Sequence, residues 1–326
     1  MSMDLAGWIP IRLNWSESGL KVDWCQLGDL RFTDPFFEQT VGQCLRHPAN
    51  LLFRRETPVE ILGALDDLDA SLAPTGFIFH MSRCGSTLIS QMLAAQPENV
   101  VISEASPIDT LLRAPLRDPG ITEDQQAAWL QGLLKALGQR RFSGEKHLFV
   151  KFDCWHTLCL PLIQRAFPEV PWIFLYREPL EVLVSQHNQM GGQMIPGMLE
   201  PALFGWDAQA VTRMGWPEYG GRVLGRICEV ALEQAGAGRG KLVNYCQLPE
   251  VVWSELMTYW GVGCVPEAVE TMRRVSALNA KNPALPFEAD VQVKQGGVTE
   301  EIRQVARQWL DETYRQLESR RTGMAA

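Results

Sequence analysis

Residues 77–93, "FIFHMSRCGSTLISQML", decide the fold of this chain. An apolar run at Phe77–Phe79 gives way to a small polar cluster, Ser82–Thr87, and an apolar helical pattern follows. This order predicts a strand, a tight loop and a helix, an arrangement that presents backbone N–H groups to a phosphate. The loop lacks the Gly-Lys-Ser/Thr ending of a nucleotide-hydrolysing P-loop, so Arg83 is the cation that the loop itself provides. An ordinary strand-to-helix turn would show the same pattern.

Apolar runs that alternate with helical patterns continue along the chain. The predicted strands are Phe77–Phe79, Val100–Ile102, Leu148–Phe152, Trp172–Tyr176 and Leu242–Asn244. The predicted helices are Thr87–Ala95, Asp124–Leu137, Leu158–Ala166, Leu180–Gln189, Val251–Trp260 and Thr299–Leu317. Short strands that alternate with longer helices imply βαβ crossovers. The sequence therefore predicts an α/β fold, a parallel doubly wound sheet flanked by helices, of the P-loop nucleotide-binding type.

The domain organisation follows from where this pattern begins. Residues 1–72 are predicted to form an N-terminal appendage packed on the core. Residues 73–326 are predicted to form the α/β domain, with a helical C-terminal part. Because ligands of parallel sheets bind beyond the C-terminal ends of the strands, the loop and the strand ends should meet at one edge.

Composition excludes several classes of function. The 326 residues carry a formal net charge of −8, which argues against a general nucleic-acid-binding surface. No segment approaches the ~20 apolar residues of a membrane span, and residues 1–15 lack a signal-peptide pattern. The eight cysteines form no CxxC pair, which favours reduced thiols and a cytoplasmic location. Cys154, His156 and Cys159 lie close together, but no second ligand cluster accompanies them, so we expect buried helix residues and no metal.

Two further motifs contain groups that could hold a nucleotide. In "WIFLYREPLEVLVSQHN", Arg177 ends a predicted strand and Ser185 follows eight residues later on the next helix. Together they could hold a second phosphate, although strand-end arginines also form structural ion pairs. In "LVNYCQLP", Tyr245 ends a strand, where its ring could stack on a base or simply pack.

Together the three motifs resemble the sulfotransferase family, which uses 3′-phosphoadenosine 5′-phosphosulfate as sulfuryl donor. "SRCGSTL" is similar to the 5′-phosphosulfate loop, which implies that Arg83, Cys84, Gly85, Ser86 and Thr87 bind the donor. "YREPLEVLVS" is similar to the 3′-phosphate motif, which implies the same for Arg177 and Ser185. "LVNYCQL" resembles the tyrosine strand near the adenine, which brings in Tyr245. The resemblance runs from about Phe77 to Tyr259, and no metal is implied.

Arginine in the loop resembles the tyrosylprotein sulfotransferases and the bacterial enzymes near them. That branch implies a glutamate base after the second strand, here Glu104 in "VVISEASP", and a lysine ending the next strand, here Lys151 in "HLFVKFD". Glu104 also fits a helix N-cap partner before "PIDTLL". The cytosolic branch uses histidine, which makes His80, His156 and His187 rival bases, and His156, just past Lys151, is the strongest of the three.

His80 ends the loop strand and His187 lies in the predicted 3′-phosphate helix, so both are predicted to be structural. The resemblance suggests a further contact with the donor. Lys281 and Lys294 are candidates for a further clamp on the 3′-phosphate, and Lys294 in "DVQVKQGG" resembles the branch better.

The predicted function is transfer of a sulfuryl group from the donor to a hydroxyl acceptor by in-line displacement, with Arg83 and Lys151 neutralising the leaving phosphate. Pocket walls are expected from Ser106–Pro115, from the loop Gly191–Phe204 and from the N-terminal appendage. The apolar residues of that loop favour a hydrophobic small-molecule acceptor, although a loop packed into the core would show the same composition. Two alternatives stay open. A P-loop kinase would need a loop lysine and an acidic Mg²⁺ ligand, and a non-catalytic nucleotide-binding protein would need neither Glu104 nor Lys151. Nothing in the sequence indicates an oligomeric state.

Overall fold

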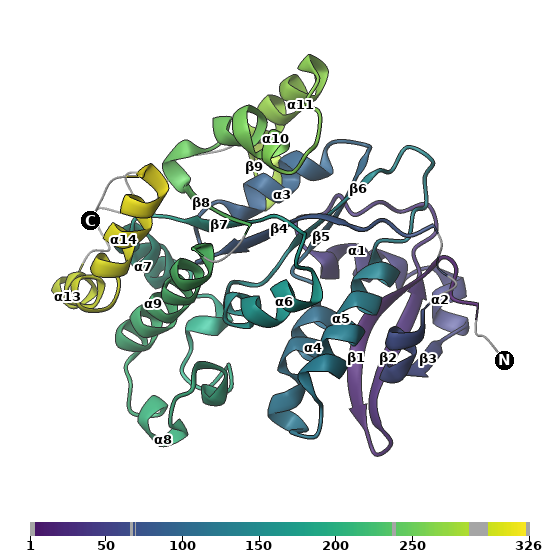
Figure 1. Cartoon of the computed structure of the whole chain (residues 1–326), viewed down its shortest axis with the longest axis horizontal. Coiled ribbons are helices and arrows are strands. Elements are labelled where there is room, and N and C mark those ends of the chain that lie inside the picture. The colour runs from purple at the N-terminus through teal and green to yellow at the C-terminus, as the bar shows by residue number, and fades with distance from the viewer. Residues whose placement is uncertain (1–3, 66–67, 69, 237–238, 287–298, 324–326) are drawn as a thin grey trace.

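A five-stranded parallel sheet forms the centre of the molecule, in a computed structural model that describes residues 4–65, 68, 70–236, 239–286 and 299–323 (Figure 1). Its spatial order is β5-β6-β4-β7-β8, and neighbouring strands all run parallel. The strands are β4 (Pro74–His80), β5 (Asn99–Ser103), β6 (His147–Lys151), β7 (Trp172–Tyr176) and β8 (Gly240–Asn244). The predicted parallel α/β sheet is confirmed, because each predicted strand overlaps one of these.

Helices cover both faces of this sheet, as a doubly wound fold requires (Figure 1). One face carries α3 (Ser86–Ala94), α10 (Met257–Tyr259), which continues a π-helical turn over Val252–Leu256, and α11 (Pro266–Ser276). The other face carries α4 (Ser106–Arg117), α5 (Glu123–Leu137), α6 (Leu160–Ala166) and α9 (Trp216–Ala235). Beyond β8 lie α7 (Pro179–Asn188), α13 (Glu300–Trp309) and α14 (Asp311–Thr322).

The remaining elements lie at the ends of the molecule. An antiparallel sheet of β1 (Trp8–Ser16), β2 (Gly19–Gln26) and β3 (Arg55–Pro58) packs through β1 on α4 and α5. With it lie α1 (Phe37–Cys44) and α2 (Pro48–Leu52). A short hairpin of β9 (Leu278–Asn279) and β10 (Asn282–Pro286) follows α11, and α8 (Ala208–Val211) precedes α9. The domain boundary near residue 72 stays a prediction.

The order of the strands determines where a ligand can bind. From β4 the chain crosses to β5 on one side and later returns to β7 on the other, so the topology reverses at the C-terminal end of β4. A crevice forms at such a reversal, because the neighbouring connections leave in opposite directions. Phe77, Ile78 and Phe79 fix β4 in the core, since each is almost fully buried. The loop that follows His80 therefore lies at a rigid edge.

Several helical regions differ from the sequence prediction, which also lacks α1 and α11. The longest helix, α9, is not predicted, because Gly220, Gly221 and Gly225 interrupt its apolar pattern. These glycines allow close packing, since a Cβ on Gly221 would lie 2.3 Å from Val305 Cγ1 and one on Gly225 would lie 2.6 Å from the Trp309 carbonyl oxygen.

The single C-terminal helix predicted over 299–317 is wrong. The helix breaks at Leu310, whose side chain is buried, and both α13 and α14 thereby stay packed on α9. No helix of the described residues is long and apolar enough to cross a membrane.

Candidate functional site

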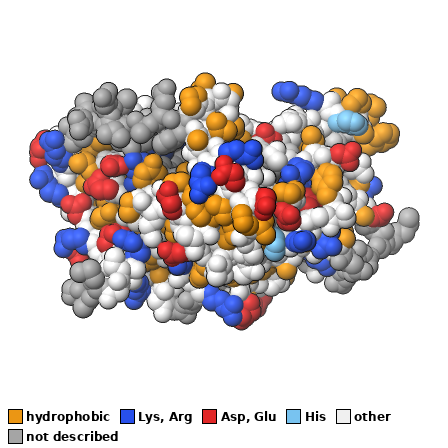
Figure 2. All heavy atoms as spheres, turned by 90° about the horizontal axis from the view of Figure 1, so that it is seen from above, with side chains coloured by type: hydrophobic (Ala, Val, Ile, Leu, Met, Phe, Trp, Pro, Cys, Tyr) orange, Lys and Arg blue, Asp and Glu red, His pale blue; other side chains and the backbone are white. Residues whose placement is uncertain are grey.

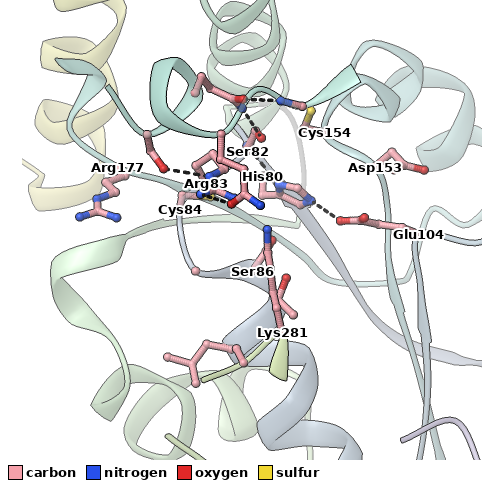
Figure 3. Close-up of a pocket in the computed structure, with 18 of the residues that line it drawn as sticks. His80, Ser82, Arg83, Cys84, Ser86, Glu104, Asp153, Cys154, Arg177 and Lys281 are labelled. Carbon is pink, nitrogen blue, oxygen red and sulfur yellow. Dashed lines mark hydrogen bonds and ion pairs between the residues drawn. The ribbon is translucent and has the colours of Figure 1, made fainter. Parts of the chain in front are cut away.

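A cavity of about 620 Å³ opens at the C-terminal end of β4, where the sequence predicts the site. Its walls include the predicted loop Arg83–Thr87, Glu104, Arg177, Ser185 and Tyr245. Figure 3 shows Arg83 between Arg177 on one side and Glu104 on the other. The structure therefore brings the predicted motifs together, with Lys151, His156 and Lys294 as the exceptions described below.

The loop between β4 and α3 is held in an unusual backbone conformation. Ser82, Arg83 and Gly85 have φ values of 81°, 51° and 90°. A glycine is required at position 85, because its Cβ would lie 2.7 Å from Leu248 Cδ1 and 3.1 Å from the Tyr245 ring. Left-handed residues are costly outside glycine and concentrate at ligand-binding sites.

The same loop directs donors into the cavity. Gly85 is the N-cap of α3, and no side chain caps that helix. The first amides of a helix have no partner within it and bear a partial positive charge. Cys84 anchors the loop instead of facing a ligand, since its buried Sγ donates to the Leu175 carbonyl oxygen at 3.1 Å. Its contribution to a ligand is therefore limited to the backbone.

Glu104 lies at the end of β5 in a strained backbone conformation, with φ at 53°. Its Oε1 is 2.6 Å from Lys151 Nζ and 3.4 Å from His80 Nε2. Figure 3 shows the His80–Glu104 contact. Burial opposes ionisation, yet the Lys151 ammonium and the His80 ring hold the pKa of Glu104 well below its ordinary range. The carboxylate is therefore ionised and fixed in direction.

Lys151 and His80 position Glu104 from behind. Lys151 is fully buried, does not line the cavity, and also donates to Thr87 Oγ1 at 3.4 Å. His80 Nδ1 accepts from the Ser82 N–H at 3.1 Å, which leaves the proton on Nε2, facing Glu104. Burial, against the opposing effect of Glu104, lowers the pKa of His80 and keeps the ring neutral. The predicted loop, base and lysine thus form one connected group.

His156 lies outside the cavity. Its Nδ1 accepts from the Asp153 N–H at 3.2 Å and its Nε2 is 3.0 Å from Asp109 Oδ1, so both ring nitrogens are occupied. Asp153, which the sequence analysis did not select, does line the cavity. Burial and the charges of Glu104 and Asp109 raise the pKa of Asp153 to about 7, against the opposing effect of His156. The only sign in the sequence that Asp153 belongs to the site is its position two residues after Lys151.

Arg83 connects the loop to α7. Its Nε donates to Ser185 Oγ at 2.8 Å and one terminal nitrogen donates to Gln189 Oε1 at 3.1 Å. Two residues from different motifs, separated by 102 positions in sequence, are thereby in direct contact. Gln186 and Gln189 also line the cavity and were not predicted.

Arg177 lies on the same side of the cavity as Ser185. Its guanidinium carbon is 4.0 Å from the centre of the Tyr245 ring, and its Nε donates to Glu181 Oε2 at 2.6 Å. An arginine stacked on an aromatic face is held in orientation. This end of the cavity therefore combines a cation with an aromatic ring.

A second lysine reaches the cavity from the β9–β10 hairpin. Lys281 lines the cavity, and Figure 3 shows its side chain directed from the hairpin toward the loop. Partial burial and the positive charge of Arg83 lower the pKa of Lys281. Lys294, the preferred candidate from sequence, lies outside the described residues.

The predicted acceptor walls agree with the structure only in part. Phe36, Met190, Gly191 and Gln193 line the cavity, whereas no residue of 106–115 does. The apolar loop 191–204 packs mainly into the core, because Met194, Leu199 and Phe204 are buried. Its composition therefore reflects core packing more than an apolar acceptor pocket.

The described residues contain no cluster of three or more His, Cys, Asp or Glu side chains arranged to hold a metal ion. Cys154 and His156, two of the three residues considered for a metal, are instead buried.

Comparison with known proteins gives a likeness of overall arrangement. No protein-family model and no curated protein matches this chain. Similar solved structures include a sulfotransferase from Alicyclobacillus acidocaldarius, 12% identical, with 78% of this chain and 97% of that chain covered and a TM-score of 0.46. A sulfotransferase domain from the curacin biosynthetic pathway is 16% identical, with 78% and 99% covered and a TM-score of 0.42.

A sulfotransferase from Mycobacterium tuberculosis is 12% identical, with 77% and 82% covered and a TM-score of 0.43. At these values the likeness does not establish a family. The chemistry of the chain has to be inferred from its own residues.

Proposed function

We propose that the protein is a sulfotransferase that moves a sulfuryl group from 3′-phosphoadenosine 5′-phosphosulfate to the hydroxyl of a small-molecule acceptor. The observation that supports this most strongly is a single cavity with an anion-binding loop at its centre, a stacked arginine at one end and an ionised carboxylate at the other. A ligand with two separate anionic groups and a reacting centre beside the carboxylate fits this order. The resemblance of the three sequence motifs to those of sulfotransferases also implies 3′-phosphoadenosine 5′-phosphosulfate as the donor.

The donor would lie along the cavity from Tyr245 to the loop. Amides of the first turn of α3, the hydroxyls of Ser86 and Thr87, and Arg83 would hold the 5′-phosphosulfate. Arg177 and Ser185 would hold the 3′-phosphate, with Tyr245 against the base. In the ligand-free site Glu181 is paired with Arg177, so the 3′-phosphate would have to share this cation with Glu181.

In the transfer step the acceptor oxygen forms a bond to sulfur while the bond from sulfur to the bridging phosphate oxygen breaks. The electron pair leaves with the phosphate, and the acceptor proton passes to Glu104. Charge builds on the leaving oxygen in such a loose transition state, so fixed cations and positioning account for most of the catalysis. Arg83 and Lys281 are the cations that line the cavity there. Lys151 would act indirectly, by orienting Glu104 and Thr87.

A thermal-shift screen tests the donor class. Adenosine 3′,5′-bisphosphate should raise the melting temperature in the presence of a metal chelator, because a ligand at 100 times its Kd stabilises the folded state by about 2.7 kcal/mol. ATP with Mg²⁺ and GTP serve as comparisons. Stabilisation by ATP with Mg²⁺ and none by the bisphosphate would favour a kinase. Bisphosphate binding without transfer from labelled donor to any phenol or alcohol of a panel would favour a non-catalytic protein.

A further inference from the structure

Helix α2 has the opposite of the usual surface pattern. A surface helix ordinarily buries its apolar side chains and exposes its polar ones. In α2 the one buried residue is Asn50, whereas Leu51 and Leu52 are 62% and 75% exposed. Phe53, which follows the helix, is 67% exposed. We refer to Leu51, Leu52 and Phe53 as the α2 tip.

The α2 tip is held in place by the fold. Asn50 Nδ2 donates to the carbonyl oxygens of Gln26 and Cys44 at 2.8 and 3.0 Å, and its Oδ1 accepts from the Gln26 N–H at 3.0 Å. These three bonds fix α2 against the end of β2 and the end of α1. The apolar side chains are therefore displayed by a defined structure.

The chain segment that carries the tip is basic in an otherwise acidic protein, although Glu38 and Glu56 border it. Residues 39–55 contain no Asp or Glu, although the chain has a formal net charge of −8. Arg46 and Arg54 are exposed, and neither forms an ion pair with a carboxylate in the part of the chain that the structure describes. At the end of the molecule where α2 lies in Figure 1, Figure 2 shows hydrophobic side chains beside a histidine, with basic and some acidic side chains around them.

The shape and charge of the α2 tip favour a fluid, anionic layer as its partner. Successive residues of a helix point about 100° apart, so the side chains of the tip spread around the helix and do not share one flat face. A fluid layer can surround such a tip, whereas a protein partner would need a matching cleft. In a symmetric contact with a second copy, Arg46 and Arg54 of the two copies would lie close together and repel each other. An anionic surface would attract these arginines instead.

We propose that the α2 tip inserts into the headgroup layer of an anionic lipid surface, with Arg46 and Arg54 binding lipid phosphates. Short apolar tips flanked by arginine bind such layers by combining apolar burial with attraction to anionic headgroups. This inference does not depend on the proposed enzymatic activity, because it concerns a surface outside the cavity.

Vesicle flotation with the full chain tests the proposal. The protein should float with vesicles of phosphatidylcholine mixed with phosphatidylglycerol, and bind vesicles of phosphatidylcholine alone at least about tenfold more weakly. Replacing Leu51, Leu52 and Phe53 together with Ser should weaken binding to the mixed vesicles at least about tenfold. The double change Arg46→Gln and Arg54→Gln should weaken it roughly 25-fold, about fivefold for each arginine.

The matched control is the double change Met198→Ser and Val265→Ser, which removes equally exposed apolar side chains elsewhere and should leave binding unchanged. No binding of the parent protein to the mixed vesicles would overturn the proposal. So would equal losses in the control and the tip variant. Sedimentation that shows a dimer, dissociated by the tip variant, with no lipid binding would make the tip an interface between copies instead.

Discussion

The orientation and the ionisation of Glu104 are both determined by its neighbours. Its left-handed backbone turns the side chain from the end of β5 toward Lys151 and His80. Both neighbours lower the pKa of the carboxylate, so it is ionised at every physiological pH. An ionised group of fixed direction can receive the acceptor proton late in a loose transition state.

Replacing Glu104 with Gln should remove the base and keep the shape of the side chain. Turnover should fall by ~10²–10⁴, while the affinity for adenosine 3′,5′-bisphosphate stays unchanged or improves because a negative charge is lost. The measurement is transfer from labelled donor, with bisphosphate binding measured in parallel. His156→Gln is the comparison. Normal turnover in Glu104→Gln combined with a large loss in His156→Gln would make His156 the base, and unfolding of Glu104→Gln would make Glu104 a structural cap.

Arg177 is expected to distinguish two nucleotides. Adenosine 3′,5′-bisphosphate carries a 3′-phosphate that adenosine 5′-monophosphate lacks, so Arg177→Ala should weaken only the first strongly. A charge-assisted hydrogen bond of this kind contributes ~1.5–3 kcal/mol. Titration calorimetry with both nucleotides measures the difference. Equal weakening of the two would mean that Arg177 acts on another part of the ligand.

At the scale of elements, the phosphate loop depends on two neighbours that are remote in sequence. The Tyr245 and Leu248 side chains after β8 lie directly over Gly85. Arg83 donates to Ser185 on α7. The loop conformation is thus determined by β4, α7 and the segment after β8 together, which are the three motifs of the sequence.

Gly85→Ala should disturb the loop through both its backbone and its contacts. A side chain at a φ of 90° is strained, and its Cβ would lie 2.7 Å from Leu248 Cδ1. We expect a loss of ~1–3 kcal/mol in the free energy of unfolding and at least about tenfold weaker bisphosphate binding. Gly144→Ala is the control, because its Cβ would meet no atom within 4 Å and its φ is ordinary. Similar melting temperatures for the two variants would contradict this account of the loop.

The sequence predicted the sheet well because each central strand is a short, continuous apolar run, as strands buried on both faces should be. It could not predict α9, because the glycines that weaken its helical pattern serve contacts with α13, which lies about 80 residues away in sequence. The same contrast between local patterns and remote contacts applies to the site. Arg83, Arg177 and Tyr245 could be found from motifs, whereas the burial of Lys151 and the role of Asp153 depend on packing between strands and helices that no local pattern specifies.

At the scale of the whole molecule, an acidic protein is expected to bind a highly anionic donor. The cations that such a donor would need are concentrated locally, because Arg83, Arg177 and Lys281 all line one cavity. Two acids at this cavity shift in opposite directions: Lys151 and His80 lower the pKa of Glu104 against its burial, whereas burial and the charges of Glu104 and Asp109 raise that of Asp153. Opposite shifts of this kind make the stability of the whole protein depend on pH.

Asp153 contributes to that dependence between its ordinary pKa and neutral pH. Its pKa is about 7 in the folded protein against an ordinary 3.8, so between these values the folded state retains a proton that the unfolded chain has lost. The contribution of Asp153 to stability should therefore fall as the pH rises through this window. Glu104 acts outside the window: its lowered pKa gives stability that is lost only as the pH falls below its ordinary 4.5.

Asp153→Asn should remove this loss, because an amide does not titrate. At pH 8 the variant should be more stable than the parent on the order of 2 kcal/mol, or several degrees in Tm, and near pH 4.5 the two should nearly coincide. The two proteins share every other titratable group, so the difference between the two Tm curves reports on Asp153. Asn at the exposed Asp29 is the control and should follow the parent at every pH. Parallel curves for the parent and Asp153→Asn would mean that Asp153 is ionised in the folded protein, and that Glu104 has no neutral acid beside it.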